Sequence, residues 1–113
     1  MDNMTVYDKC QALTASIKSS REYVEFKDIK KIVMAEPGLK EKIDEFEKIR
    51  YEEQLLAMQG EKQSEEKMAK LQELYKILVQ NPKVKEYFDK EVKFNLMIAD
   101  INKMIGESIK DVL

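Results

Sequence analysis

Few side chains in this chain could carry out catalysis, and the sequence offers no nucleophile–base pair, metal ligand set or phosphate loop. The 113 residues contain no histidine, which removes His-dependent triads and HExxH zinc sites. The single cysteine, Cys10, lies on an apolar stripe at helical spacing, so we expect a buried structural thiol. The glycines Gly38, Gly60 and Gly106 are isolated, so no Gly-rich phosphate loop can form. The sequence therefore predicts a protein that is not an enzyme and that holds no metal or cofactor.

Charged residues are abundant but balanced in sign. The chain has 20 basic and 22 acidic residues and a formal net charge of −2. This balance gives no bulk attraction to nucleic acid or to an anionic membrane. The acidic pairs Glu52-Glu53 and Glu65-Glu66 are consecutive, and consecutive residues do not share a helix face. We interpret both pairs as solvated surface charge.

Lys27, Lys30 and Lys31 form a basic cluster that could contact phosphate. Glu25 and Asp28 interrupt this cluster, and the sequence indicates no aromatic platform beside it. We therefore do not expect nucleic acid as a partner. A helical nucleic-acid-binding module that uses these lysines remains the alternative hypothesis, and salt-dependent RNA binding would support it.

The overall composition is typical of a single helical domain spanning residues 1–113. Hydrophobic residues make up 43% of the chain and charged residues 37%, with only three glycines and two prolines. One cysteine excludes an internal disulfide and fits a reducing compartment. No signal peptide is recognisable, and no apolar run approaches the roughly 20 residues of a membrane span. We expect a cytoplasmic protein.

Five helices are predicted, separated by capping residues and turns. They are expected at about residues 4–18, 21–35, 38–59, 65–78 and 82–112. Ser20 and Ser64 can cap the second and fourth helices, and Asn81-Pro82 is a strong start signal for the fifth. Gly60 can end the third helix. The short polar turn that follows predicts an antiparallel hairpin of the third and fourth helices.

The fifth helix is expected to be longer than the rest of the domain can cover. Thirty helical residues span about 45 Å, whereas a compact domain of this size is about 35 Å across. Its middle is apolar on most sides, which indicates burial on most sides. We therefore predict a homodimer or higher homo-oligomer, part of an oligomeric helical bundle. In the other interpretation, Gly106 breaks the helix and the tail folds back. The predicted interface residues are Val92, Phe94, Ile98, Ile101 and Ile105.

The order and spacing of these helix-boundary residues extend along nearly the whole chain. The relevant stretches are Val6-Tyr7-Asp8, Ser20-Arg21-Glu22-Tyr23 with Phe26-Lys27, Pro37-Gly38-Leu39-Lys40 leading into Phe46, Gln59-Gly60-Glu61 with Ser64-Glu65-Glu66, Asn81-Pro82-Lys83-Val84 and Ile101-Asn102-Lys103-Met104-Ile105-Gly106. Because these stretches occur in this order and at this spacing, the chain resembles the YlbF/YmcA (Com_YlbF) family of small helical bacterial proteins. That family includes an uncharacterised YheA-type branch, which this layout also resembles.

The resemblance implies a regulatory or adaptor protein that forms homo-oligomers or assemblies with related family members. Characterised relatives are non-enzymatic regulators of competence, sporulation and biofilm formation. They act in a complex linked to RNA processing, and that complex can carry iron–sulfur clusters. Cluster-binding relatives use cysteines near the C-terminus, where this sequence has none, and Cys10 matches no such position. Because such clusters normally take four cysteine ligands, we expect none in this protein.

Overall fold

The computed structural model describes residues 5–113, which form five α-helices and no strand. The helices are α1 (Val6–Ser19), α2 (Arg21–Met34), α3 (Pro37–Met58), α4 (Glu65–Leu78) and α5 (Pro82–Ser108). The all-α class and the five predicted helices are thus confirmed for this part of the chain. None of these helices is both long and apolar enough to cross a membrane.

Side-chain caps begin most of the helices where the sequence places them. Ser20, Ser64 and Asn81 each accept a hydrogen bond from a backbone N–H two or three residues later, at 3.2, 3.3 and 2.9 Å. Thr5 and Asp8 form a reciprocal capping box at the start of α1. Each bond satisfies an N–H that the helix itself leaves unpaired. The helix starts are therefore encoded locally.

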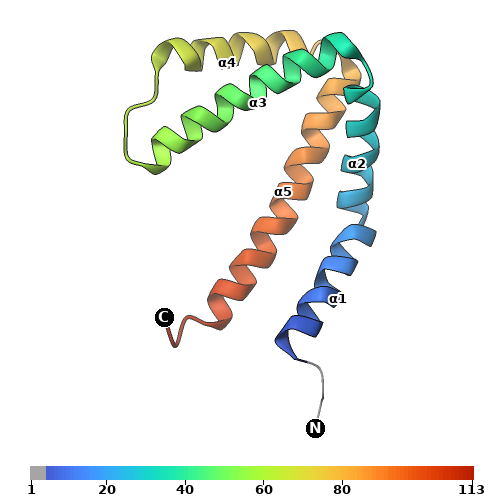
Figure 1. Ribbon diagram of the computed structural model, residues 1–113, viewed down its shortest axis with the longest axis vertical. Coiled ribbons are helices and arrows are strands. Elements are labelled where there is room, and N and C mark those ends of the chain that lie inside the picture. Colours follow the sequence, from blue (N-terminus) through green and yellow to red (C-terminus); the bar gives the residue numbers. More distant parts are fainter. Residues whose placement is uncertain (1–4) are drawn as a thin grey trace.

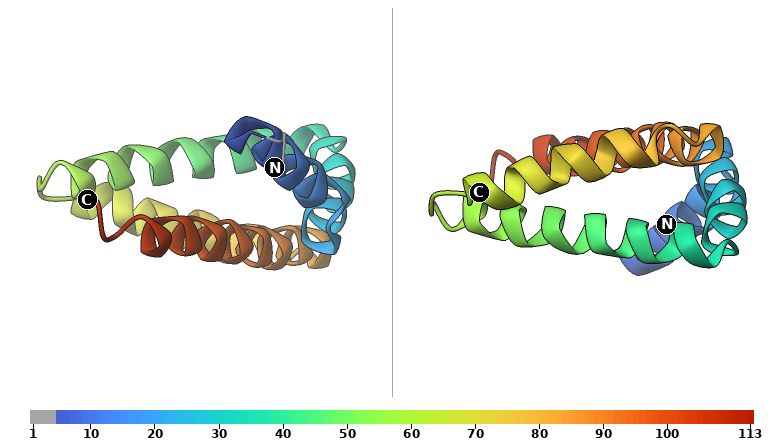
Figure 2. Two further views of the ribbon diagram at one scale, coloured as in Figure 1. Left: turned by 90° about the horizontal axis from the view of Figure 1, so that it is seen from below. Right: turned by 90° about the horizontal axis from the view of Figure 1, so that it is seen from above.

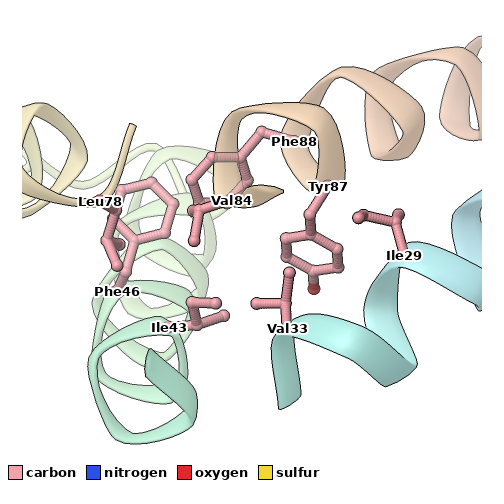
Figure 3. Close-up of a cluster of buried hydrophobic side chains, with 8 residues drawn as sticks. All are labelled: Ile29, Val33, Ile43, Phe46, Leu78, Val84, Tyr87 and Phe88. Atoms are coloured by element: carbon pink, nitrogen blue, oxygen red, sulfur yellow. The ribbon is translucent and has the colours of Figure 1, made fainter. Parts of the chain in front are cut away.

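The hydrophobic core lies where α2, α3, the end of α4 and the start of α5 meet (Figure 3). Val33, Ile43 and Val84 are completely buried there. Two aromatic rings of α5 extend the core in both directions. Tyr87 stacks on Phe26 of α2 at 5.6 Å between ring centroids, and Phe88 lies 5.4 Å from Phe46 of α3. The core is thus small and is confined to one end of α5. Its buried members are Ile29, Val33, Ile43, Phe46, Leu78, Val84, Tyr87 and Phe88.

Helices α3 and α4 form the predicted antiparallel hairpin and pack against each other, as Figure 1 and the right view of Figure 2 show. Gly60 follows α3 with a φ of 74°, in the left-handed region that glycine adopts without a Cβ clash. The Glu61 N–H donates to the Leu56 carbonyl oxygen at 2.9 Å, which satisfies a carbonyl of the last helical turn. Gly60 therefore ends α3 as expected.

Glu53 contradicts the interpretation of the Glu52-Glu53 pair as surface charge, because its side chain is only 1% exposed. Its carboxylate accepts a hydrogen bond from the Ser64 N–H at 3.0 Å, and its backbone carbonyl accepts one from the Gln63 side chain at 3.2 Å. The loop before α4 folds over Glu53 and covers it. Glu52 remains accessible and pairs with Lys67 of α4 at 2.8 Å. The glutamate pair thus connects the hairpin from two sides.

The molecule is extended, because two helices leave the core without folding back onto it. Its extents are 56 × 36 × 16 Å, and its radius of gyration is 18.0 Å, against about 13 Å for a compact chain of this length. Figure 1 shows α1 and the distal half of α5 running away from the core, while the hairpin projects in another direction. Helix α5 continues through Gly106 to Ser108, so the alternative in which Gly106 breaks it is wrong.

Substitution of Gly60 should identify it as a left-handed cap. We expect Gly60→Ala to lower the free energy of unfolding by about 1 kcal/mol, since a Cβ is disfavoured at positive φ. Gly38→Ala is the matched control, because Gly38 lies in a helical first turn with open space around its Cα. Urea denaturation of both variants measures the difference. A higher midpoint for Gly60→Ala than for wild type would contradict this assignment.

Candidate protein-interaction surface

Helix α5 is buried only over its first two turns. Val84, Tyr87 and Phe88 are its buried residues, and from Asp89 to Ser108 no side chain of α5 is fully covered. This distal stretch still carries large apolar residues at helical spacing. A solvent-exposed apolar stripe of this length is typical of a surface that another chain covers.

The five predicted interface residues do not all lie on one outward face. Val92 and Ile105 are 56% and 51% exposed. Phe94, Ile98 and Ile101 are half-buried. Phe94 packs within this chain, with its ring centroid 6.0 Å from that of Tyr23 and 5.6 Å from that of Phe26 on α2. Part of the predicted interface stripe therefore holds α5 against α2, and the remainder is free for a partner.

Other exposed apolar residues enlarge this surface beyond the predicted set. Leu96 lies one turn beyond Val92 and is 59% exposed, and Met104 near the end of α5 is 71% exposed. On α1, Val6 and Tyr7 are each 81% exposed. Leu96 and Met104 could have been added to the predicted interface from the apolar pattern of α5. Nothing in the sequence shows that Tyr7 points to solvent. We call α1 together with residues 89–108 of α5 the arm surface.

Helix α1 has no buried residue, which contradicts the expectation of a buried Cys10. Cys10 is exposed, and only Leu13 and Ile17 on the same stripe are half-buried. The physical reason is that α1 packs against α2 near their shared junction and does not reach the core. The spacing gives α1 one apolar face, but within residues 5–113 no side chain of that face is fully buried.

The accessible surface of the chain is larger than its mass requires. A compact folded monomer of 13.3 kDa exposes about 6,450 Å². This chain exposes 8836 Å², or about 2,400 Å² more. A stable protein–protein interface of ordinary size covers about 800 Å² on each partner. The excess is thus several times what one such interface needs.

Polar contacts fix the direction of α5 relative to α2 and α3. Lys90 donates to Glu25 of α2 at 2.6 Å, and Arg50 of α3 pairs with Glu91 at 3.1 Å. The Tyr87 hydroxyl donates to the Glu47 carboxylate at 2.8 Å. Burial, with that carboxylate nearby, raises the pKa of Tyr87 well above its usual range. The phenol therefore stays protonated and acts as a permanent donor.

The basic cluster of the alternative hypothesis lies beside aromatic rings. Lys27 and Lys30 lie at the edge of a cavity of about 220 Å³ between α2 and α5. Tyr23, Phe26 and Phe94 line the rest of this cavity. The expectation that no aromatic platform adjoins the lysines was wrong. Tyr23 and Phe26 lie one helical turn before Lys27 and Lys30 on α2, which the sequence could have indicated, and Phe94 joins them from α5.

No other arrangement in the described part of the chain suggests catalysis. Residues 5–113 contain no group of three or more cysteine or carboxylate side chains placed to hold a metal ion. The charged groove near Arg21 contains the Lys90–Glu25 ion pair between α5 and α2, and the groove near Lys67 contains the Lys67–Glu52 ion pair between α4 and α3. These pairs join neighbouring helices. The exposed apolar side chains of the arm surface are therefore the feature on which we base a function.

Comparison with known proteins connects this architecture to a family. The family model described as "Control of competence regulator ComK, YlbF/YmcA" matches residues 6–110. A UPF0342 protein of Desulfitobacterium hafniense is 36% identical over 110 residues, which cover 97% of this chain and 89% of that protein. A UPF0342 protein of Caldicellulosiruptor bescii is 34% identical over 105 residues, covering 93% and 88%. The family resemblance read from the sequence is confirmed.

Two solved structures share the fold. A protein of unknown function (DUF964) from Bacillus stearothermophilus superposes with a TM-score of 0.77 at 14% identity, over 95% of this chain and 94% of that one. The protein yheA from Bacillus subtilis superposes with a TM-score of 0.69 at 16% identity, over 97% and 100%. At these identities the likeness establishes the arrangement of the helices.

The ion pair that attaches α5 to α2 should make stability depend on pH in the acid range. Hydrogen bonds from Lys90 and then Arg21 lower the pKa of Glu25 from 4.5 to about 2. A carboxyl with a lowered folded-state pKa stabilises the fold fully above about pH 4.5, and this contribution disappears as the pH falls toward 2. We expect Glu25→Gln to lower the denaturation midpoint at pH 7 and to match wild type near pH 2.

Glu41→Gln on α3 is the control for this measurement, because it removes the same charge at an exposed position. Its midpoint should follow that of wild type at every pH. Thermal denaturation at several pH values between 7 and 2 provides the comparison. An offset between Glu25→Gln and wild type that stays constant down to pH 2 would show that the ion pair is not its cause.

Proposed function

Since the chain belongs to the YlbF/YmcA family, we propose that it is a non-enzymatic regulatory or adaptor protein that works through protein–protein contacts in an oligomeric helical assembly. The observation that supports this proposal is the set of large apolar side chains that the arm surface leaves exposed, which are Val6, Tyr7, Val92, Leu96, Met104 and Ile105. Apolar side chains exposed in this number are costly to leave in water. A protein with such a surface functions with it covered.

A second copy of the chain is the first partner that the arm surface fits. The excess area of two copies is about 4,800 Å² in total, and covering half of it already reaches the 2,000–5,000 Å² range of obligate homodimers. Each Å² of apolar area removed from water contributes about 25 cal/mol. Association costs about 4–15 kcal/mol in lost freedom, so only part of this gain appears as affinity.

The cellular role follows from the family as a further part of this proposal. The matching family model is named for control of the competence regulator ComK. We propose that this chain acts in the same kind of regulation, which in the family covers competence, sporulation, biofilm formation and RNA processing. In such a role, the chain supplies a helical scaffold to a regulatory complex and performs no chemistry itself.

The alternative function, nucleic-acid binding, gains the aromatic rings beside Lys27 and Lys30 as support. Electrostatics limit it, since Lys27, Lys30 and Lys31 can neutralise only about three phosphates. Proteins that bind nucleic acid firmly make about 6–10 phosphate contacts. Protein–protein contact therefore remains the function that the observations favour.

The self-association surface can be mapped with aspartate substitutions at positions that the single chain leaves exposed. We expect wild type at micromolar concentration to sediment with at least twice the 13.3 kDa mass of the chain. Val92→Asp and Ile105→Asp should each reduce this to the single-chain mass, because an unpaired carboxylate is costly in a dry interface. Folding should survive, since both side chains already contact water.

Met58→Asp is the matched control, because Met58 is also exposed and apolar but lies at the far end of the hairpin. It should sediment like wild type, and circular dichroism should confirm that all the variants are helical. A wild-type mass of 13.3 kDa across the micromolar range would contradict self-association. If Met58→Asp dissociated the oligomer and neither α5 variant did, the interface would lie on the hairpin instead.

A further inference from the structure

The cavity between α2 and α5 has an apolar lining large enough for one side chain. Three aromatic rings line the cavity, and the Phe94 ring of α5 packs on both Tyr23 and Phe26 of α2, with centroid distances of 6.0 and 5.6 Å. The volume of about 220 Å³ is that of a single large apolar residue. The rings are half-buried, so their positions are fixed by the packing of α5 on α2. The cavity therefore needs no rearrangement to accept a ligand.

The ammonium groups of Lys27 and Lys30 stand at the edge of this cavity, and Lys31 follows Lys30 on the same helix. Among residues 5–113, none of Lys27, Lys30 and Lys31 has a carboxylate oxygen within 4.0 Å. Lys27 instead lies over the Tyr23 ring, at 5.8 Å from its centroid. The nearby carboxylate of Glu25 is already occupied by Arg21 and Lys90. The positive charge at the edge of the cavity is thus available to an acidic ligand.

The spacing of these lysines suits an acidic helix. Lys27 and the Lys30-Lys31 pair are one helical turn apart, which is also the spacing of side chains three or four residues apart on a partner helix. An apolar side chain between two such acidic residues could enter the cavity while each acid meets a lysine. Interfaces of this kind depend on a few buried anchors with charges at their rim.

We propose that this cavity is a docking site for an acidic amphipathic helix of another protein, with one large apolar residue in the ring-lined cavity and glutamate or aspartate residues paired with Lys27 and Lys30. The inference deepens the adaptor function proposed above and depends on it.

Phe94 belongs to the arm surface, but its ring packs on Tyr23 and Phe26 of α2. The exposed apolar side chains of distal α5, among them Val92 and Ile105, do not line the cavity. We expect the chain to self-associate through those exposed side chains and still bind a different protein here.

The test uses full-length protein and a short fluorescent helical peptide with two glutamates four residues apart and a leucine three residues after the first of them, so that the glutamates match the one-turn spacing of Lys27 and Lys30. Fluorescence anisotropy should show saturable binding at micromolar protein. Lys27→Glu/Lys30→Glu should weaken binding by about tenfold or more, since two favourable charge pairs become repulsive. Replacing the peptide's leucine with alanine should weaken it comparably.

Lys42→Glu/Lys62→Glu makes the same change of net charge on the hairpin, at two exposed lysines, and should bind the peptide like wild type. No saturable binding by wild type would overturn the proposal, as would equal losses in both double variants. Binding of single-stranded DNA that Lys27→Glu/Lys30→Glu abolishes, without peptide binding, would assign the site to nucleic acid instead.

Sedimentation of the same variants separates this inference from the proposed self-association. Lys27→Glu/Lys30→Glu should keep the mass of wild type, which places the cavity outside the interface between copies. A fall to the single-chain mass would overturn docking of a separate protein and make the cavity part of the self-association surface. Peptide binding by a wild-type protein that sediments as a single chain would support the docking site while contradicting the oligomeric assembly.

Discussion

The positions of all the other helices depend on how the first turns of α5 pack against α2 and α3. Tyr87 and Phe88 place aromatic rings on both neighbours, and Val84 fills the space between them. The hydroxyl of Tyr87 reaches Glu47, and Lys90 reaches Glu25, so the apolar contact is oriented by hydrogen bonds at its edges. Two helical turns thus determine the direction of a 27-residue helix.

The rest of α5 follows from this junction because an α-helix is stiff over its length. At 1.5 Å per residue, the 27 residues extend about 40 Å, most of it beyond the core. Helix α1 lies at the same end of the molecule as the distal part of α5, away from the core (Figure 1), and none of its residues is buried. The apolar residues of both helices are therefore presented to solvent by a rigid support. This arrangement makes the surface suitable for binding, because little conformational freedom is lost when a partner covers it.

Helix boundaries could be predicted from the sequence because their causes are local. Ser20, Ser64 and Asn81 cap the helices that follow them, and Gly60 ends α3. Burial depended on distant residues and was less predictable. The sequence did not show that a loop eleven residues away would cover Glu53.

The same limit applies to the candidate sites. The apolar residues of α1 have helical spacing, yet Cys10 is exposed and no residue of α1 is fully buried. Phe94 was expected in the interface between chains, but it packs on Tyr23 and Phe26 within one chain. It thereby forms the cavity beside Lys27 and Lys30 that the sequence did not indicate. Periodicity identifies which face is apolar, and only the fold shows what covers it.

Amide hydrogen exchange followed at several protein concentrations tests most directly whether a second copy covers the arm surface. We expect the amides of α1 and of residues 92–108 to become more protected as concentration rises through the association range. Amides near Val33 and Val84 should exchange at rates that hardly change, because the core is complete within one chain. Protection of the arm surface that is equally low at every concentration would contradict a covering second copy.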